Sequence, residues 1–369
     1  MKRIVIIANK FWEAEPILSA MLNTKITPLC VSAPQRPDDK NPNYSDQTLK
    51  LNYPWNNKFS TIDSTKDGDG SDALKPMVEW TYQGGNVVVE LWCLAYVLDS
   101  RKNILPANQK GGTPPDFTDI TSSSDWKNRC LPSIFQYGNN PPDFTIAIGT
   151  AGYPPKDNDE SHNGCVIIGS NIFIHDFYPE GKTPNPRSNF KNEKFEQLLS
   201  STIPDQFFVD VCVQDVLKTI NCSLLMPFLT PPNAPDINSS PQVLFGKEYL
   251  GVSVVNVTDY REYSDDNGVG ADKDGIDAAK TALTQEITTI GSLETTHGII
   301  RLNNDDAPFI FISGITDRST MYFKEDDSLG MDKNGSVKTL AQNFTAAFNA
   351  GVCIGNLLPK IVDYVTAQK

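Results

Sequence analysis

Residues 309–317 read FIFISGITD, four large apolar residues followed by SGIT and an acid. Such a run is typical of a strand buried on both faces, as in the covered sheet of an α/β protein. The sequence predicts that this strand ends in a small, flexible turn at Gly314 and delivers Asp317 at its carboxyl end. Ligands of open α/β sheets bind at that end of the strands, although a lone Asp after a strand is more often a turn or helix-capping residue.

Apolar, β-branched runs like this one recur along the chain, and helical patterns lie between some of them. The runs are residues 4–8, 87–91, 144–148, 165–168, 250–257 and 309–312. The helical patterns are residues 195–199, 210–220, 277–287 and 337–368. Strands that alternate with helices predict an α/β fold with a covered, mostly parallel sheet.

Composition and charge narrow the class of protein. The chain of 369 residues has a net charge of −13 and no run of Lys or Arg, which disfavours nucleic acid or an anionic membrane as the main partner. The first apolar run is too short for a secretory signal, and no stretch approaches the apolar length of a membrane span. Seven scattered cysteines without a CxxC pair indicate free thiols, so we expect a cytoplasmic protein. Three unclustered histidines argue against a metal site, and nothing points to a cofactor.

Two more predicted strands end in residues suited to chemistry. Residues 149–152, GTAG, follow the strand at 144–148, and the backbone N–H groups of such a Gly-rich turn can face a sugar or a phosphate. Residues 292–298, SLETTHG, place Glu294 at the start of an apolar, helix-like stretch. Each has a simpler interpretation, namely a tight corner for GTAG and a glutamate favoured by the helix dipole for Glu294.

The order of these features resembles that of a known family. GTAG is followed by NGCVII at 163–168, by His175-Asp176, by ETT-x-G from Glu294, by GITD, and by a terminal helix with NAG at 349–351. This order resembles the nucleoside phosphorylase and nucleosidase superfamily, which includes the purine nucleoside and uridine phosphorylase-like proteins. Its motifs are closest to those of methylthioadenosine/adenosylhomocysteine nucleosidase and futalosine hydrolase. The resemblance is strongest over residues 143–176 and 251–358.

The resemblance implies one α/β domain over residues 1–369, with a phosphorylase/hydrolase-like three-layer fold in which helices flank a twisted mixed central sheet. Residues 35–138 and 178–188 are longer than the family needs, so the sequence predicts long insertions there. A homo-oligomer is implied as well, because the superfamily commonly assembles as dimers, trimers or hexamers. The implied partners are a small-molecule purine nucleoside and water, or phosphate in place of water if the protein is a phosphorylase.

The resemblance also assigns roles to residues. Asp317 falls on the family's catalytic aspartate, and Glu294, preceded by Leu293, falls on the glutamate that holds the ribose hydroxyls. Glu13 falls on the N-terminal glutamate of the nucleosidases, with Glu15 as the alternative if the register slips. The other positions assigned to substrate binding are Tyr260, which would stack on the base, and Thr150, Ala151, Gly152 and Ser313.

These residue types suit the cleavage of an N-glycosidic bond. The leaving purine gains negative charge, which a carboxylic acid can neutralise by donating a proton to N7 if a dry strand end keeps that acid protonated. A second carboxylate at the ribose stabilises the oxocarbenium-like positive charge of the sugar. Asp317 is the implied acid, and Glu294 is the implied ribose ligand.

Hydrolysis is favoured over phosphorolysis by two positions where the phosphorylases of the family carry arginine. The turn after the first strand reads ANKFWE at 8–13, and position 147 is alanine. Glu13 in that turn would repel phosphate and could activate water as a general base. A phosphorylase with atypical phosphate ligands and a non-catalytic nucleoside-binding relative remain as alternatives. Ser313 stands where the nucleosidases often carry arginine, and the sequence gives His297 no assigned role.

Overall fold

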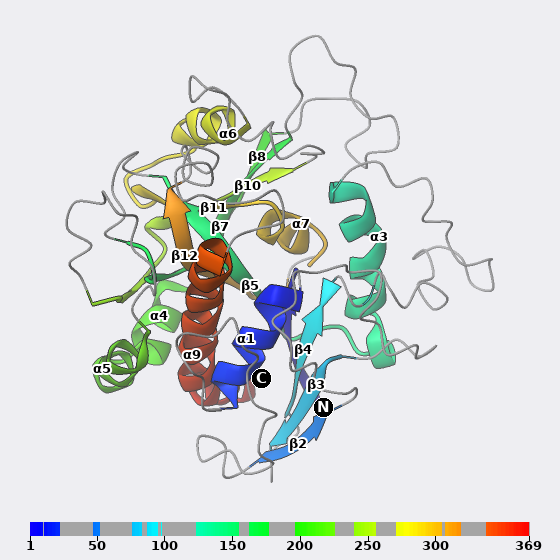
Figure 1. Ribbon diagram of the computed structural model, residues 1–369. Helices are drawn as coiled ribbons and strands as arrows, with labels where there is room; N and C mark the ends of the chain where they lie inside the picture. Colours follow the sequence, from blue (N-terminus) through cyan, green and yellow to red (C-terminus); the bar gives the residue numbers. More distant parts are fainter. Residues whose placement is uncertain are drawn as a thin grey trace.

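The structure is a computed structural model, and the residues that it describes are 1–9, 11–22, 47–51, 76–82, 87–94, 97, 123–154, 162–176, 196–225, 240–255, 271–304, 307–318 and 337–368. Within these ranges, 12 strands form one mixed sheet that helices cover on both faces (Figure 1). The predicted α/β architecture, a mixed central sheet flanked by helices, is confirmed.

The strands follow the order β2-β3-β4-β1-β5-β11-β10-β7-β8, and β12, β6 and β9 branch from β5. Their bounds are β1 Lys2–Ala8, β2 Gln47–Leu51, β3 Val78–Tyr82, β4 Val87–Cys93, β5 Phe144–Tyr153, β6 Val166–Gly169, β7 Asn171–Asp176, β8 Glu196–Leu199, β9 Val243–Phe245, β10 Tyr249–Val255, β11 Thr289–Glu294 and β12 Phe309–Arg318. The helices are α1 Phe11–Met21, α3 Ser123–Phe135, the 3-10 turn η4 Tyr137–Asn139, α4 Asp205–Val211, α5 Gln214–Ser223, α6 Ala271–Lys280, α7 His297–Leu302 and α9 Val337–Ala367.

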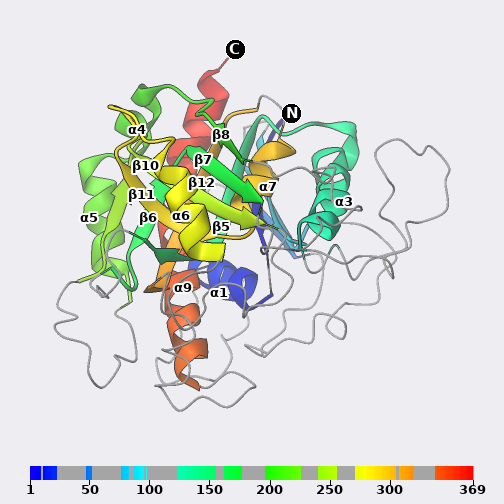
Figure 2. The ribbon, with the colours of Figure 1, turned by 90° about the horizontal axis from the view of Figure 1, so that it is seen from above.

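The two faces of the sheet explain why its strands are so apolar. Successive side chains of a strand point to opposite faces. Ile4 and Ile6 of β1 pack in the core formed with α1 and α9, whereas Val5 and Ile7 pack in the core formed with α3 and α7. Figures 1 and 2 both show α1 and α9 side by side on one face. Because both faces are covered, every position of such a strand is dry.

The terminal helix predicted at 337–368 is confirmed as α9. In the described part of the chain, it is the one helix long and apolar enough to cross a membrane by length and composition, over Thr345–Ala367. However, 78% of its most apolar window is buried inside the fold, where α9 packs against α1 and β12. Its apolar character is therefore that of a core helix.

The two predicted Gly-rich turns are wrong, because both segments continue as strands. β5 runs through GTAG to Tyr153, and β12 runs through GITD to Arg318. The two strands pair in parallel from Phe309↔Thr145 to Arg318↔Tyr153, with one irregularity between Ile315 and Asp317. Each strand supplies the pairing that holds the other's glycines in an extended conformation.

Other predicted helices also differ from the structure. Residues 195–199 form the strand β8, which pairs with β7, and residues 210–220 are divided between α4 and α5 by a break at Cys212. The helix expected at 277–287 begins earlier and ends at Lys280. Short apolar runs do not separate strand from helix by pattern alone, because pairing with a neighbouring strand decides the outcome.

Part of the segment that the sequence marks as an insertion, residues 35–138, lies within the sheet. β4 pairs in parallel with β1, β3 pairs with β4, and β2 pairs with β3. α3 belongs to the same segment and packs beside α7, on the face of the sheet opposite α1 and α9. The second predicted insertion, residues 178–188, lies outside the described residues.

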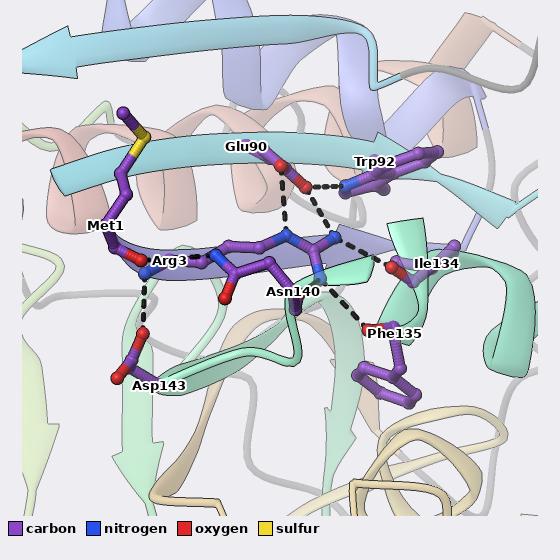
Figure 3. Close-up of polar contacts among 8 residues, drawn as sticks. All are labelled: Met1, Arg3, Glu90, Trp92, Ile134, Phe135, Asn140 and Asp143. Carbon is purple, nitrogen blue, oxygen red and sulfur yellow. Dashed lines mark hydrogen bonds and ion pairs between the residues drawn. The ribbon is translucent and has the colours of Figure 1, made fainter. Parts of the chain in front are cut away.

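A buried arginine attaches α3 to the amino end of the sheet (Figure 3). The Arg3 guanidinium forms a two-point contact with Glu90 of β4, at 3.0 Å and 2.7 Å, and also donates to the carbonyls of Ile134 and Phe135 at 2.7 Å and 3.1 Å. Trp92 donates to the same Glu90 carboxylate at 2.7 Å. Such a fully bonded ion pair fixes the end of α3 against β1 and β4.

Candidate active site

The site lies where β5 changes its neighbour in the sheet. The first half of β5 pairs with β1 as far as Ala8↔Ile148, and Gly152 pairs with Leu293 at the end of β11. β12 pairs with the other edge of β5 along its length. On the edge that β1 and β11 share, residues 149–151 therefore face the space between the ends of these two strands. The carboxyl ends of four strands, β1, β5, β11 and β12, therefore meet at this fork.

Glu13 of α1 reaches this edge of β5. Its carboxylate is buried, and Oε1 accepts hydrogen bonds from the backbone N and the hydroxyl of Thr150, both at 2.9 Å. Since α1 follows β1 directly, its first turn sits at the point where β1 ends. Glu15 is buried as well, and Glu13 is the residue that accepts the hydrogen bonds of Thr150 in β5.

His297, the first residue of α7, approaches the same point from the other side. A Cβ atom placed on Gly149 would lie 2.8 Å from Glu13 Oε1 and 3.6 Å from His297 Nε2. The imidazole is buried, stacks on Phe311 with ring centroids 6.1 Å apart, and has Nδ1 3.5 Å from the Ser313 hydroxyl. Glycine at position 149 thus keeps the space between a carboxylate and an imidazole free of a side chain.

Glu294 ends β11, rather than opening a helix as the sequence suggested. One carboxylate oxygen accepts a hydrogen bond from the Ser253 hydroxyl, and the other accepts from the backbone N atoms of Thr296 and His297, the latter at 2.7 Å. Ser253 in turn accepts from the N of Gly298 at 2.6 Å. The carboxylate is therefore fixed in direction before any ligand binds.

Lys127 of α3 supports the turn that holds Glu294. Its ammonium group is buried and donates to the Thr295 carbonyl at 2.8 Å, to the Thr295 hydroxyl at 3.3 Å and to the Thr296 hydroxyl at 2.7 Å. A buried ammonium group has a high desolvation cost unless oxygen atoms surround it. This cation fixes the backbone between Glu294 and His297 and lends positive charge to that end of the site.

β12 closes the far side of the fork. Ser313 is buried with its hydroxyl toward His297, and the backbone of Asp317 pairs with Gly152. The side chain of Asp317 lies outside the described residues, and so does Tyr260. The backbone register nevertheless brings position 317 to the same end of β5 as Leu293 and Glu294.

The remaining predicted substrate-binding residues differ in their surroundings. Thr150 faces Glu13, whereas Ala151 is packed in the core near α3 and α7, and Leu293 is packed in the core near α6. Two residues that sequence reasoning did not select, Ser253 and Lys127, hold Glu294 in place. Ser253 carried a faint signal as a hydroxyl within an apolar strand, but nothing in the sequence around Lys127 relates it to Glu294.

The second buried histidine, His175 of β7, has Nδ1 3.1 Å from a carboxylate oxygen of Glu196 in β8, and β11 and β10 lie between β5 and β7 in the sheet. In the described part of the chain, no group of three or more His, Cys, Asp and Glu side chains is placed to hold a metal ion.

No protein-family model matches the chain, and no curated protein matches it in sequence. Similar solved structures include 5′-methylthioadenosine nucleosidase of Arabidopsis thaliana in apo form, with 11% identity and a TM-score of 0.40 over 100% of this chain and 98% of that one. Another is 5′-methylthioadenosine/S-adenosylhomocysteine nucleosidase of Neisseria meningitidis in complex with methylthio-immucillin-A, with 14% identity and a TM-score of 0.42 over 97% and 99%. A third is futalosine hydrolase of Helicobacter pylori, with 10% identity and a TM-score of 0.43 over 97% of each chain. These proteins are members of the superfamily that the motifs resemble, and at such identities and scores the similarity assigns no role to a residue of this chain.

Proposed function

We propose that this protein is a purine nucleosidase that hydrolyses the N-glycosidic bond of an adenosine-type nucleoside or a derivative of one. The observation that carries the proposal is the placement of two carboxylates along one free stretch of β5. Glu13 is bonded to Thr150, and Glu294 follows the residue that pairs with Gly152. Gly149 and Gly152 are three residues apart, about 10 Å along a strand, which suits a ribose between the two acids.

Glu294 is the residue for the sugar. A carboxylate offers about four lone-pair positions, and donors from Ser253, Thr296 and His297 fill three of them in the described structure. A ribose hydroxyl would complete the set. The fixed negative charge would also stabilise the positive charge that develops on the ribose during bond cleavage.

Asp317 is proposed as the general acid. It follows the driest part of β12, where Phe309, Phe311 and Ile312 are fully buried, and its backbone pairs with Gly152. A carboxylic acid that burial keeps protonated can pass its proton to the purine N7 as the base departs. A pyrimidine offers no N7, so this acid favours purines.

Glu13 favours water over phosphate as the nucleophile. The Thr150 N–H and hydroxyl are the kind of donors that a phosphate would use, and a carboxylate oxygen already accepts from both. A phosphate there would also meet the negative charge of Glu13. A carboxylate in this position can instead accept a proton from an attacking water molecule.

The test is release of free base from a panel of purine and pyrimidine nucleosides in phosphate-free buffer. We expect base release from at least one purine nucleoside, and a loss of roughly 10²- to 10⁴-fold in kcat for Asp317→Asn and for Glu13→Gln. Circular dichroism of both variants controls for folding. Release only when phosphate is added would indicate a phosphorylase, and adenine binding without any cleavage would indicate a non-catalytic binding protein.

A further inference from the structure

The geometry points to His297 as the second residue that holds the attacking water, opposite Glu13 and beside Gly149. This inference rests on the proposed hydrolysis and adds a residue that the sequence left without a role. It concerns the path of the proton and the direction of attack, not the identity of the nucleoside.

The space beside Gly149 is the first reason. The position of a Cβ atom on Gly149 is 2.8 Å from Glu13 Oε1 and 3.6 Å from His297 Nε2, so these two atoms are at most about 6.4 Å apart, the sum of the two distances. Two acceptors that share one water molecule through hydrogen bonds of about 2.8 Å lie about 4.5 Å apart at the tetrahedral angle, which is within that limit. Any side chain at position 149 would occupy this space.

The restraint on the imidazole is the second reason. The ring lies against Phe311, its Nδ1 faces the Ser313 hydroxyl at 3.5 Å, and its backbone N donates to Glu294. These contacts turn Nε2 toward Gly149 and Glu13. A histidine that only filled the core would not need its second nitrogen directed at a buried carboxylate.

The charged groups around the ring belong to three elements. Glu13 of α1 and Nε2 both line the space beside Gly149, Glu294 of β11 accepts from the backbone N of His297, and Lys127 of α3 donates to the neighbouring Thr296. Arg301 lies at the other end of α7, against Phe309.

The chemical step follows from this placement. With the proton of His297 on Nδ1, directed at Ser313, Nε2 accepts one hydrogen of the water and Glu13 accepts the other. The water then presents a lone pair to C1′ of the ribose. As its oxygen bonds to C1′, the bond from C1′ to the purine N9 breaks and its electron pair stays with the base. The water gives one proton to Glu13, and the proposed acid, Asp317, protonates the base at N7.

The kinetic test compares His297→Gln with a matched control, His175→Gln, which replaces the buried histidine of β7, two strands further along the sheet than β11. We expect kcat of His297→Gln to fall roughly 10²-fold with KM little changed, whereas His175→Gln keeps the wild-type kcat. An active wild type whose kcat is unchanged in His297→Gln would overturn the role of His297 alone.

A second measurement does not depend on turnover. The chain contains three histidines, so a protein with carbon-13-labelled imidazoles gives three ring signals. Glu13→Gln should move the His297 signal and leave that of His175 in place. A His297 signal that stays unmoved would overturn the shared water site even if the enzyme is active. Absence of base release from every nucleoside would instead overturn the proposed hydrolysis, and the role of the water with it.

Discussion

Gly149 lies in β5, and Gly314 lies in β12, which pairs with β5. Gly149 pairs with Ser313 and Gly314 pairs with Thr150, but the two glycines make room for different neighbours. A Cβ atom on Gly149 would meet the Glu13 carboxylate, whereas a Cβ atom on Gly314 would lie 2.1 Å from the backbone oxygen of Ala346 in α9. The first glycine accommodates the Glu13 carboxylate, and the second accommodates a helix. Glycine within a strand often marks such a close approach.

Replacing each glycine by alanine should separate these two purposes. Gly149→Ala would push the Glu13 carboxylate away from Thr150, and a displacement of about 1 Å can cost roughly 10²-fold in rate, so we expect base release to fall by that order. Gly314→Ala should instead lower the free energy of unfolding by roughly 1–3 kcal/mol, because the backbone of α9 must move. Denaturant unfolding and base-release assays of both variants are the measurements.

The opposite pattern, with Gly149→Ala unfolding easily and Gly314→Ala as stable as the wild type, would contradict this division. Wild-type activity in Gly149→Ala would show that the space beside Gly149 is not used in catalysis.

Among the helices, α3 is held at two places about 10 Å apart, two turns along its axis. Near its end, the carbonyls of Ile134 and Phe135 accept hydrogen bonds from Arg3, and closer to its start Lys127 donates to Thr295 and Thr296. The first attachment joins the helix to the sheet. The second transmits that rigidity to the turn that positions Glu294.

Lys127→Met keeps the length of the side chain and removes its charge and its hydrogen bonds. We expect a loss of about 1–3 kcal/mol in the free energy of unfolding, because the oxygens around the ammonium group lose their donor, while removal of a buried charge offsets part of the cost. The KM for nucleoside should rise, since the turn next to Glu294 loosens. The matched control is Lys273→Met on the exposed face of α6, where Lys273 pairs with Asp277, and this change should leave KM and the unfolding midpoint unaltered. Equal KM values in both variants would argue against the supporting role of Lys127.

The sequence predicted elements whose signal is local and missed those decided by distant partners. The apolar runs at 4–8 and 309–312 form strands, as predicted, because a strand that is buried on both faces has an apolar residue at each position. GTAG and GITD look like turns by residue type, but pairing between strands some 160 positions apart keeps them extended. The same reason applies to the strand at 195–199, which exists through its pairing with β7.

The residues of the candidate site also fall into two groups, those that sequence motifs indicated and those that only the fold brings to the site. Family-like motifs pointed to Glu13, Glu294 and position 317, which the fold brings to one end of β5. Ser253 carried only a faint signal and Lys127 carried none, because only the folded chain brings them to Glu294, across 41 positions in one case and to the adjoining turn in the other. Single residues that act through position alone leave no pattern in a sequence.

In the molecule as a whole, the helices that cover both faces of the sheet bury thiols as well as strands. Cys165, Cys212 and Cys353 are buried, whereas Cys222 of α5 is exposed. Burial raises the pKa of Cys212 to about 12, and it raises the pKa of Cys353 in the same direction. These thiols therefore stay protonated and unreactive over the ordinary range of pH.

Alkylation with iodoacetamide at pH 8 should accordingly distinguish the thiols. We expect rapid labelling of Cys222 in the native protein and labelling of Cys212 and Cys353 only after unfolding, with peptide-resolved mass spectrometry as the readout. Cys222→Ser provides the control that removes the fast site. Labelling of Cys212 at the rate of Cys222 in the native state would mean that the core around α9 opens readily.

The placement of β12 has a consequence for how the protein acquires its site. This strand, near the end of the chain, lies between β5 and β6 in the middle of the sheet. Until it is inserted, both neighbours have open edges and neither Ser313 nor Asp317 is in place. Contacts between such distant segments form slowly, because long loops must close first. Refolding should therefore restore catalytic activity only in its last phase, and a chain that is still being synthesised will depend on protection of those two open edges.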